Sequence, residues 1–118
     1  MIILYGIPNC DTVKKARAWL SAQGLAYEFH DFKKAGVPAD PLAAWESELG
    51  WQQLLNRKGT TWRKLDPAEQ AGAVDAVSAQ ALMRAQASLI KRPVVEWGNR
   101  TKNRTTVGFD PVVWAAEL

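Results

Sequence analysis

Residues 2–32, IILYGIPNCDTVKKARAWLSAQGLAYEFHDF, decide the fold, because three periodic patterns follow one another within them. The first pattern is the apolar run Ile2–Tyr5, which stops at Gly6 and Pro8. A short apolar run bounded by turn residues is typical of a buried strand, and strands of this kind often pair in parallel. The chain is therefore expected to begin with a strand in the interior of a sheet.

A helix and a second strand are expected next. Asn9-Cys10-Asp11-Thr12 offers helix-capping side chains, and helical periodicity runs from Thr12 to a stop signal at Gly24. The apolar face of this helix consists of Val13, Ala16, Trp19 and Leu20. In Ala26–Phe32 apolar and polar residues alternate, as in a strand near the edge of a sheet. Strand, helix and strand together predict a βαβ unit with a right-handed crossover.

The middle of the chain reads as a series of short helices after a loop at residues 33–38. Asp40-Pro41 and Asp66-Pro67 each place a capping carboxylate before a proline, which is a helix-start signal. The expected helical pieces are 40–49, 51–55, 61–65, a segment from 67, and 78–85 with Ala81, Leu82 and Ala85 facing inward. The polar turn Asn56–Gly59 lies between the second and third of these pieces.

The last part of the chain reads as a hairpin and a closing helix. Strands are expected at Val94–Trp97 and Thr105–Phe109, joined by the basic loop Gly98–Arg104, which is most simply a solvated hairpin tip. Asp110-Pro111 starts a helix whose apolar side consists of Val112, Val113, Trp114 and Leu118. The order βαβ, helices, ββα predicts an α/β, thioredoxin-like fold over residues 1–118. Residues from about 36 to 90 form a helical subdomain inserted between the second and third strands.

Composition narrows the classes of function. The 118 residues are 47% apolar and include a single cysteine, so an intrachain disulfide and a cysteine-rich zinc site are both excluded. The N-terminal residues resemble neither a secretory leader nor a membrane span, and a free thiol fits the reducing cytoplasm. The net charge of +3 favours small anions at least as much as nucleic acid, and no stretch combines dense basic residues with aromatic ones.

Cys10 is the candidate nucleophile, because it falls between a strand and a helix. The unpaired amides and the dipole of a helix N-terminus stabilise a thiolate, which is the attacking form of cysteine. Lys14 and Lys15, one turn further on, add positive potential. A buried structural cysteine is the alternative, but Gly6 and Pro8 indicate an exposed turn. Since no second cysteine exists, an adduct on Cys10 must be resolved by an outside thiol, for which glutathione is the abundant candidate.

Arg57 and Arg92 are the next candidates, because a guanidinium pairs with a thiolate, an oxyanion or a carboxylate in a forked geometry. Spacing alone leaves open that both are solvated surface charges. Pro93 is a candidate for a preceding cis peptide bond, on which composition says little. His30 is expected in a strand away from the Cys10 turn, where a hydrogen-bonded or solvated histidine is favoured over a general base.

Four segments in order resemble the ArsC/Spx/YffB family and together span nearly the whole chain. They are Ile3–Ala16 around Cys10, Leu55–Leu65 around Arg57, Ile90–Val95 with Arg92-Pro93, and Val107–Asp110. The nearest likeness is to the YffB branch, whose members are described as glutathione-dependent thiol reductases. The resemblance implies a thioredoxin fold with a helical insertion, a redox-active Cys10 flanked by Arg57 and Arg92, and a cis bond before Pro93.

The resemblance also has departures that bear on the substrate. Glutathione-coupled arsenate reductases of this family carry a histidine four residues before the cysteine, a serine three after it and a third arginine after the last strand. Here these places hold Gly6, Val13 and the arginine-free stretch 108–111, which disfavours arsenate. Spx regulators often carry a second cysteine where Val13 stands.

Two functions follow as hypotheses. The first is a glutathione-dependent thiol oxidoreductase in which Cys10, Arg57 and Arg92 are catalytic, with no bound cofactor or metal and glutathione as the reducing co-substrate. Asn9, Thr12, Lys14 and Pro93 are then expected to bind glutathione or the thiol or oxyanion substrate. The second is an Spx-like regulator without turnover, whose partner is RNA polymerase.

Overall fold

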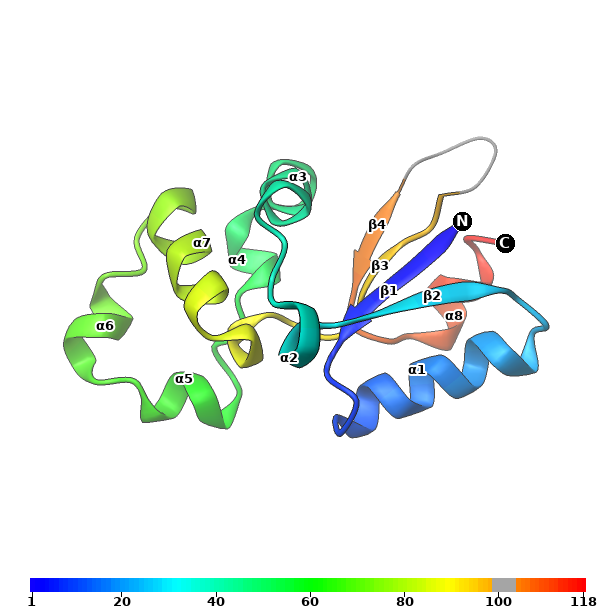
Figure 1. The fold of residues 1–118 in the computed structure, drawn as a ribbon. Helices are drawn as coiled ribbons and strands as arrows, with labels where there is room; N and C mark the ends of the chain where they lie inside the picture. The colour runs from blue at the N-terminus through cyan, green and yellow to red at the C-terminus, as the bar shows by residue number, and fades with distance from the viewer. Residues whose placement is uncertain (99–103) are drawn as a thin grey trace. The chain divides into compact units, whose positions relative to one another are not determined.

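The computed structural model describes residues 1–98 and 104–118, and Figure 1 labels its helices and strands. The elements are β1 Ile2–Gly6, α1 Asp11–Ala22, β2 Tyr27–Asp31, α2 Phe32–Ala35, α3 Ala39–Leu49, α4 Trp51–Leu54, α5 Thr60–Lys64, α6 Pro67–Ala71, α7 Ala76–Ala85, the 3₁₀ turn η1 Ala87–Leu89, β3 Val94–Glu96, β4 Thr105–Val107 and α8 Pro111–Ala115. They fall into two compact units. Met1–Lys34 and Arg92–Leu118 form the first unit, and Ala35–Lys91 form the second.

The first unit is built on a four-stranded mixed sheet in the order β2-β1-β3-β4. β1 pairs in parallel with β2 and antiparallel with β3, and β3 pairs antiparallel with β4. The expected βαβ and ββα arrangement is therefore confirmed, with β1 inside the sheet and β2 at its edge. The expected thioredoxin-like α/β class is likewise the observed one.

The helix α1 lies on the sheet through the face that its periodicity predicts. Val13, Ala16 and Leu20 are buried, whereas Trp19 is half-buried. The helix ends in a Schellman motif, because Gly24 has φ +69° and its N–H donates to the Ser21 carbonyl while that of Leu25 donates to Leu20. The stop signal at Gly24 thus acts as the sequence predicts.

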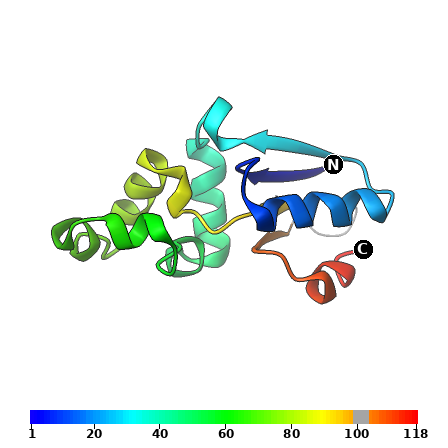
Figure 2. The same ribbon diagram turned by 90° about the horizontal axis from the view of Figure 1, so that it is seen from below.

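One apolar core joins α1, the sheet and α8. Its fully packed members are Leu4, Val13, Ala16, Leu20, Val95, Trp97 and Trp114. Trp114 is central, because its ring meets those of Trp19, Trp97 and Phe109 edge-on at centroid distances of 5.7, 5.0 and 4.9 Å. Figure 2 shows α1 and α8 side by side on this face of the sheet. Three of the six tryptophans of the sequence, Trp19, Trp97 and Trp114, therefore contribute to this core.

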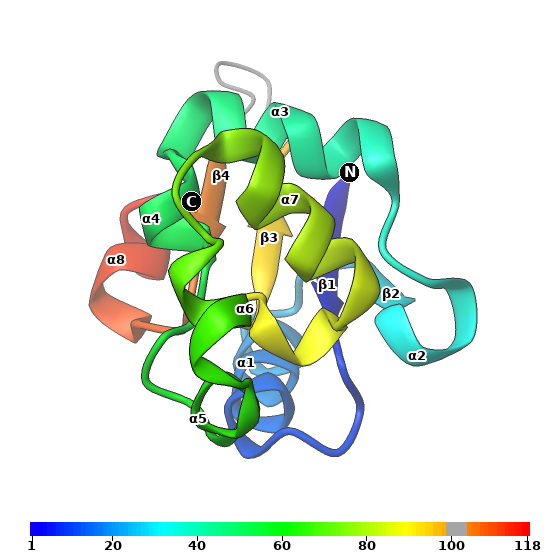
Figure 3. The same ribbon diagram turned by 90° about the vertical axis from the view of Figure 1, so that its left-hand side faces the viewer.

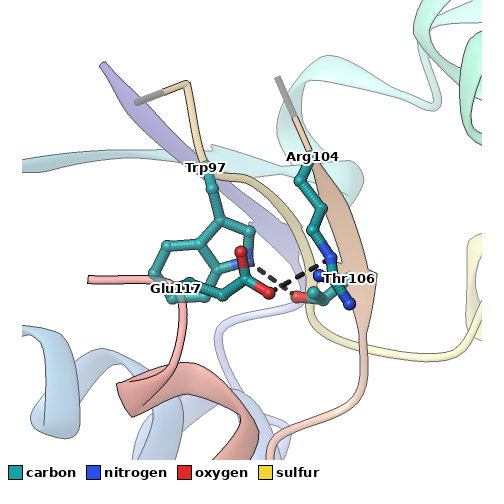
Figure 4. A network of polar contacts seen from close by, with 4 residues as sticks. All are labelled: Trp97, Arg104, Thr106 and Glu117. Carbon is teal, nitrogen blue, oxygen red and sulfur yellow. Dashed lines mark hydrogen bonds and ion pairs between the residues drawn. The ribbon is translucent and has the colours of Figure 1, made fainter. Parts of the chain in front are cut away.

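Polar contacts join the two sides of the hairpin and tie the C-terminal segment to it (Figure 4). The indole Nε1 of Trp97 donates to the hydroxyl of Thr106 at 2.9 Å. Beside it, Arg104 Nε pairs with Glu117 Oε1 at 3.1 Å, and the Glu117 side chain is only 6% exposed. Of the basic loop expected at residues 98–104, positions 99–103 lie outside the described residues.

The second unit consists of the short helices α3 to α7, which Figure 3 shows face on. Its core includes Leu42, Trp45, Leu54, Met83 and Ile90. Leu55 and Ile90 form an isolated antiparallel bridge, flanked by hydrogen bonds from Asn56 N–H to the Leu89 carbonyl (2.7 Å) and from Lys91 N–H to the Leu54 carbonyl (2.8 Å). The bridge fixes the chain that enters the polar turn after α4.

Several local expectations were wrong, each for a physical reason. Phe32–Ala35 forms a helical turn where a loop is expected from residue 33. Asp40 is not a cap, because α3 begins at Ala39 after the extended residue Pro38. In contrast, Asp66 and Asp110 do cap α6 and α8 by accepting first-turn amides.

The helices α7 and α8 also bury other residues than the sequence pattern predicts. In α7 the buried residues are Ala79 and Met83, whereas Ala81 and Ala85 are exposed and Leu82 is half-buried. The capping box of Asp75 with Ser78 starts this helix at Ala76, two residues earlier than expected. In α8 Val112 and Val113 are 80% and 42% exposed, and only Trp114 is buried; Leu118, expected on the same apolar side, lies beyond the end of α8 and is 61% exposed. A five-residue helix turns only one large side chain into the core.

Gly6 is required by the packing of α1 on β1. A Cβ at position 6 would lie 2.8 Å from Val13 Cγ2. We expect Gly6→Ala to lower the free energy of unfolding by about 1–3 kcal/mol, as overpacking does, and to cost less in a Val13→Ala background. Urea denaturation of the two single variants and the double variant measures this coupling. Gly72→Ala, whose added Cβ meets its nearest atom at 3.4 Å, is the matched control. An equal cost of Gly6→Ala in both backgrounds would show that another contact requires the glycine.

Candidate active site

Cys10 occupies the N-cap position of α1. Its own N–H donates to the Ile7 carbonyl at 3.2 Å, which closes a turn, and its carbonyl accepts the Lys14 N–H at 3.0 Å. Its backbone is extended (φ −89°, ψ 126°), and no side chain at the cap accepts a first-turn amide. The capping hydrogen bond that Asn9–Thr12 could supply is therefore not made from this position. The first amides of α1 are left facing the residue that carries the sulfur.

The sulfur-bearing residue is partly exposed. Cys10 is half-buried and packs against the edge of the core beneath α1. Asn9 and Thr12, on either side of it, are exposed, as is Lys14 one turn further along. Asp11, which the sequence analysis treated only as a cap, places a carboxylate in the first turn and opposes the positive potential of Lys14. A solvent molecule or a small reactant can therefore approach this turn.

The register of the sheet places Arg92 and Pro93 at the same end as the Cys10 turn. Tyr5 pairs with Val94 in the antiparallel β1·β3 ladder. One step forward along β1 corresponds to one step back from β3, so the register places Pro93 next to Gly6, the last residue of β1. The Arg92–Pro93 bond is cis, as the family resemblance implies. The Pro93 carbonyl accepts the Gly108 N–H at 2.9 Å, which brings the end of β4 to the same place.

The Nε–H of Arg92 is a hydrogen-bond donor that no described residue accepts from. The nitrogen is also buried. A buried guanidinium N–H without an acceptor costs free energy, and an anion would supply that acceptor. The sequence gives no signal for this property, because it depends on what surrounds the side chain.

Arg57 belongs to the second unit, whereas Cys10, Arg92 and Pro93 belong to the first. Its exposed guanidinium lies over the indole ring of Trp51, with Cζ 5.6 Å from the ring centroid. The turn that carries it is held by the Asn56 side chain, whose Oδ1 accepts the Lys58 N–H at 3.2 Å. The sequence identifies the polar turn correctly but does not identify Trp51 as a neighbour of Arg57.

On the opposite face of the sheet from α1, Tyr5 is a second titratable group that the sequence analysis did not single out. Its hydroxyl donates to Glu96 Oε1 at 2.9 Å. Burial, and then the hydrogen bond and negative charge of Glu96, raise the pKa of the Tyr5 phenol well above its usual range. His30 packs its ring against those of Tyr5 and Phe32, at 5.0 and 5.8 Å between centroids.

The residues that the structure describes, 1–98 and 104–118, contain neither a metal-binding cluster nor a membrane-spanning helix. No cluster of three or more histidine, cysteine, aspartate or glutamate residues in these ranges could hold a metal ion. Within the same ranges, no helix has the length and apolar character needed to cross a membrane.

The chain is similar to proteins of known structure along its full length. A YffB protein is 52% identical and superposes with a TM-score of 0.91, covering 100% of this chain and 99% of that one. An arsenate reductase (ArsC) related protein from Brucella melitensis is 48% identical with a TM-score of 0.73, covering 98% and 92%.

Sequence relatives agree with these structures. An uncharacterized protein of Haemophilus influenzae is 39% identical over 80% of this chain and 82% of its own length. The global transcriptional regulator Spx of Streptococcus agalactiae is 30% identical over 93% of this chain and 77% of that protein. The ArsC family model matches residues 5–116. With its thioredoxin-like sheet and the Cys10 turn at the start of α1, this chain belongs to the ArsC family.

Proposed function

We propose that this chain is a glutathione-dependent thiol oxidoreductase whose nucleophile is Cys10. The observation that carries the proposal is the placement of the lone cysteine at the N-cap of α1, at the same sheet end as Arg92, whose buried Nε meets no acceptor within residues 1–98 and 104–118. The first feature places the sulfur at the positive end of the helix dipole, and the second favours a bound anion. Membership of a family with arsenate reductase-related members supports thiol chemistry of this general kind.

The single cysteine determines the course of the reaction. The Cys10 thiolate attacks the glutathione sulfur of a mixed disulfide, forms a Cys10–glutathione disulfide, and releases the other sulfur as a thiolate that takes a proton from water. The thiolate of a second glutathione then attacks the glutathione sulfur of this adduct. Oxidised glutathione leaves and the Cys10 thiolate is restored. One disulfide is reduced and one is formed, so electrons balance without a second cysteine in the chain.

The remaining candidate residues bind rather than react. Arg92 and Arg57 are proposed to hold the carboxylates of glutathione or another anionic group of the substrate, because each guanidinium has donors to offer. Asn9, Thr12 and Lys14, exposed around the Cys10 turn, and Pro93 at the end of β3 complete the proposed surface for the tripeptide. The cytoplasm, where glutathione is abundant, is the compartment that suits this chemistry.

Arsenate is disfavoured as a substrate by the departures from the arsenate reductases that this chain resembles, because Gly6 and Val13 stand where those enzymes carry a histidine and a serine. A side chain at position 6 would collide with Val13, since even a Cβ there comes within 2.8 Å of Cγ2. The end of β1 therefore offers the oxyanion no histidine, and Val13 offers it no hydroxyl.

A regulator without turnover is the second candidate, because Spx of Streptococcus agalactiae aligns with 93% of this chain. In this alternative the partner is RNA polymerase. Purified polymerase should then bind the wild type and Cys10→Ser equally, and Cys10→Ser should retain the regulatory effect on transcription. Absence of binding at micromolar concentrations would remove the alternative.

Turnover should depend on Cys10 and on the guanidinium of Arg92. We expect the wild type to reduce the mixed disulfide of glutathione and 2-hydroxyethanethiol in an assay coupled to glutathione reductase, and Cys10→Ser to be inactive. Arg92→Ala should raise KM for glutathione roughly tenfold or more, the usual cost of losing a hydrogen bond to a charged group. Arg84→Ala, which removes an exposed arginine of α7, is the control and should match the wild type. A wild type without activity, or an active Cys10→Ser, would overturn the proposal.

The reactivity of the thiol can be tested without a substrate. We expect iodoacetamide to alkylate native Cys10 at pH 7 several-fold faster than the same cysteine in the urea-unfolded chain, because folding assembles the amides of the α1 N-terminus around the sulfur. Mass spectrometry of quenched samples gives both rates. Slower alkylation of the native chain would indicate a structural cysteine instead.

A further inference from the structure

The contact between Trp51 and Arg57 has a consequence for how an anion is bound. A guanidinium can be held in place through its edge, by a carboxylate, or through its face, by an aromatic ring. A carboxylate occupies the N–H donors, whereas a ring leaves them free. Arg57 belongs with the second kind, because its Cζ lies over the Trp51 ring, 5.6 Å from the ring centroid, and no described carboxylate pairs with it.

The backbone beneath this pair is fixed on both sides. Trp51 is the first residue of α4 and follows Gly50, whose φ of +86° suits glycine alone. At the end of α4, Leu54 and Leu55 are buried, and Leu55 bridges to Ile90. The indole is therefore carried by an anchored helical turn of the second unit, which Figure 3 shows at α4.

The turn that carries Arg57 is equally constrained. Asn56 N–H donates to the Leu89 carbonyl at 2.7 Å, and its side chain accepts the Lys58 N–H. Gly59 packs so closely that a Cβ there would lie 2.8 Å from Asn56 Nδ2. Because the backbone is held, the conformational freedom that Arg57 retains is the rotation of its long side chain. The contact with the Trp51 indole restricts that rotation.

We propose that Trp51 is a positioning residue that stacks on the face of the Arg57 guanidinium and leaves its edge donors free for the carboxylate of an anionic thiol co-substrate. The ligand class rests on the proposed function, whereas the stacking itself does not. Restricting the guanidinium before the anion arrives reduces the entropy lost on binding. Trp51 is expected to affect KM for the anion and not kcat.

A double-mutant cycle tests the coupling. Trp51→Leu should raise KM for glutathione about two- to fivefold with kcat unchanged, the effect of losing a cation–π contact at an exposed site. Trp51→Phe should restore most of the wild-type KM. In an Arg57→Ala background, Trp51→Leu should have no further effect, since nothing remains to be positioned. Trp62→Leu, which removes another half-buried tryptophan of the second unit, is the matched control and should leave KM unchanged.

A second readout does not depend on turnover. The Hε resonance of Arg57 should lie upfield through the ring current of Trp51, move downfield in Trp51→Leu, and return toward the wild-type position in Trp51→Phe. If the resonance does not move, or if Trp51→Leu raises KM equally with and without Arg57, the positioning role is wrong. If the resonance moves but the wild type has no glutathione activity, the stacking stands, and both the proposed function and the proposed ligand fail.

Discussion

The close approach of α1 to the end of β1 is the constraint on which the rest of the first unit depends. Gly6 has no side chain, and Val13 fills the space that one would need. The helix can therefore start within five residues of the strand, with Leu4, Val13 and Ala16 all fully buried. This short connection holds Cys10 at the N-cap, where no capping side chain takes the first-turn amides.

The end of β1 also positions the residues on the other side of the candidate site, Arg92 and Pro93. Because β1 pairs with β3 in register Tyr5 to Val94, the position of Gly6 also determines where Pro93 and Arg92 emerge. The Gly108 N–H then bonds the Pro93 carbonyl and brings in the end of β4. Gly6 thus helps to set the spacing between the Cys10 turn and the Arg92 turn, through packing on one side and strand pairing on the other.

Sequence patterns predicted the elements better than the faces that they bury. The βαβ unit was predictable because α1 has a single apolar stripe and ends at a glycine in the left-handed region. In α7 both sides are apolar, so hydrophobicity alone could not show that Met83 would turn inward and Ala81 outward. Asp66 and Asp40 each precede a proline, yet only Asp66 caps, because the residue before Asp40 is already helical.

The candidate site shows the same limit at a finer scale. Residue types at Cys10, Arg57 and Arg92 could be recognised along the chain, but their partners could not, since each partnership joins residues through space. That no described residue offers an acceptor to Arg92 Nε, and that a ring lies beneath Arg57, are properties of the folded chain alone. Only the cis bond before Pro93 was predictable, and then from resemblance and not from composition.

The two arginines differ in environment but share one property. Arg92 has a buried Nε without an acceptor, and Arg57 rests on an indole, so neither is neutralised by a carboxylate among the described residues. Arg104, in contrast, forms an ion pair with Glu117, and this pair serves the stability of the fold. In the proposed reaction, a chain with one cysteine would depend on an outside thiol for every turnover, and it would gain from binding that thiol instead of meeting it by collision. Guanidinium groups whose N–H donors are not used by protein carboxylates would allow such a chain to bind an anionic tripeptide. The presence of only one cysteine and the presence of two arginines that pair with no described carboxylate are thus explained by the same proposed reaction.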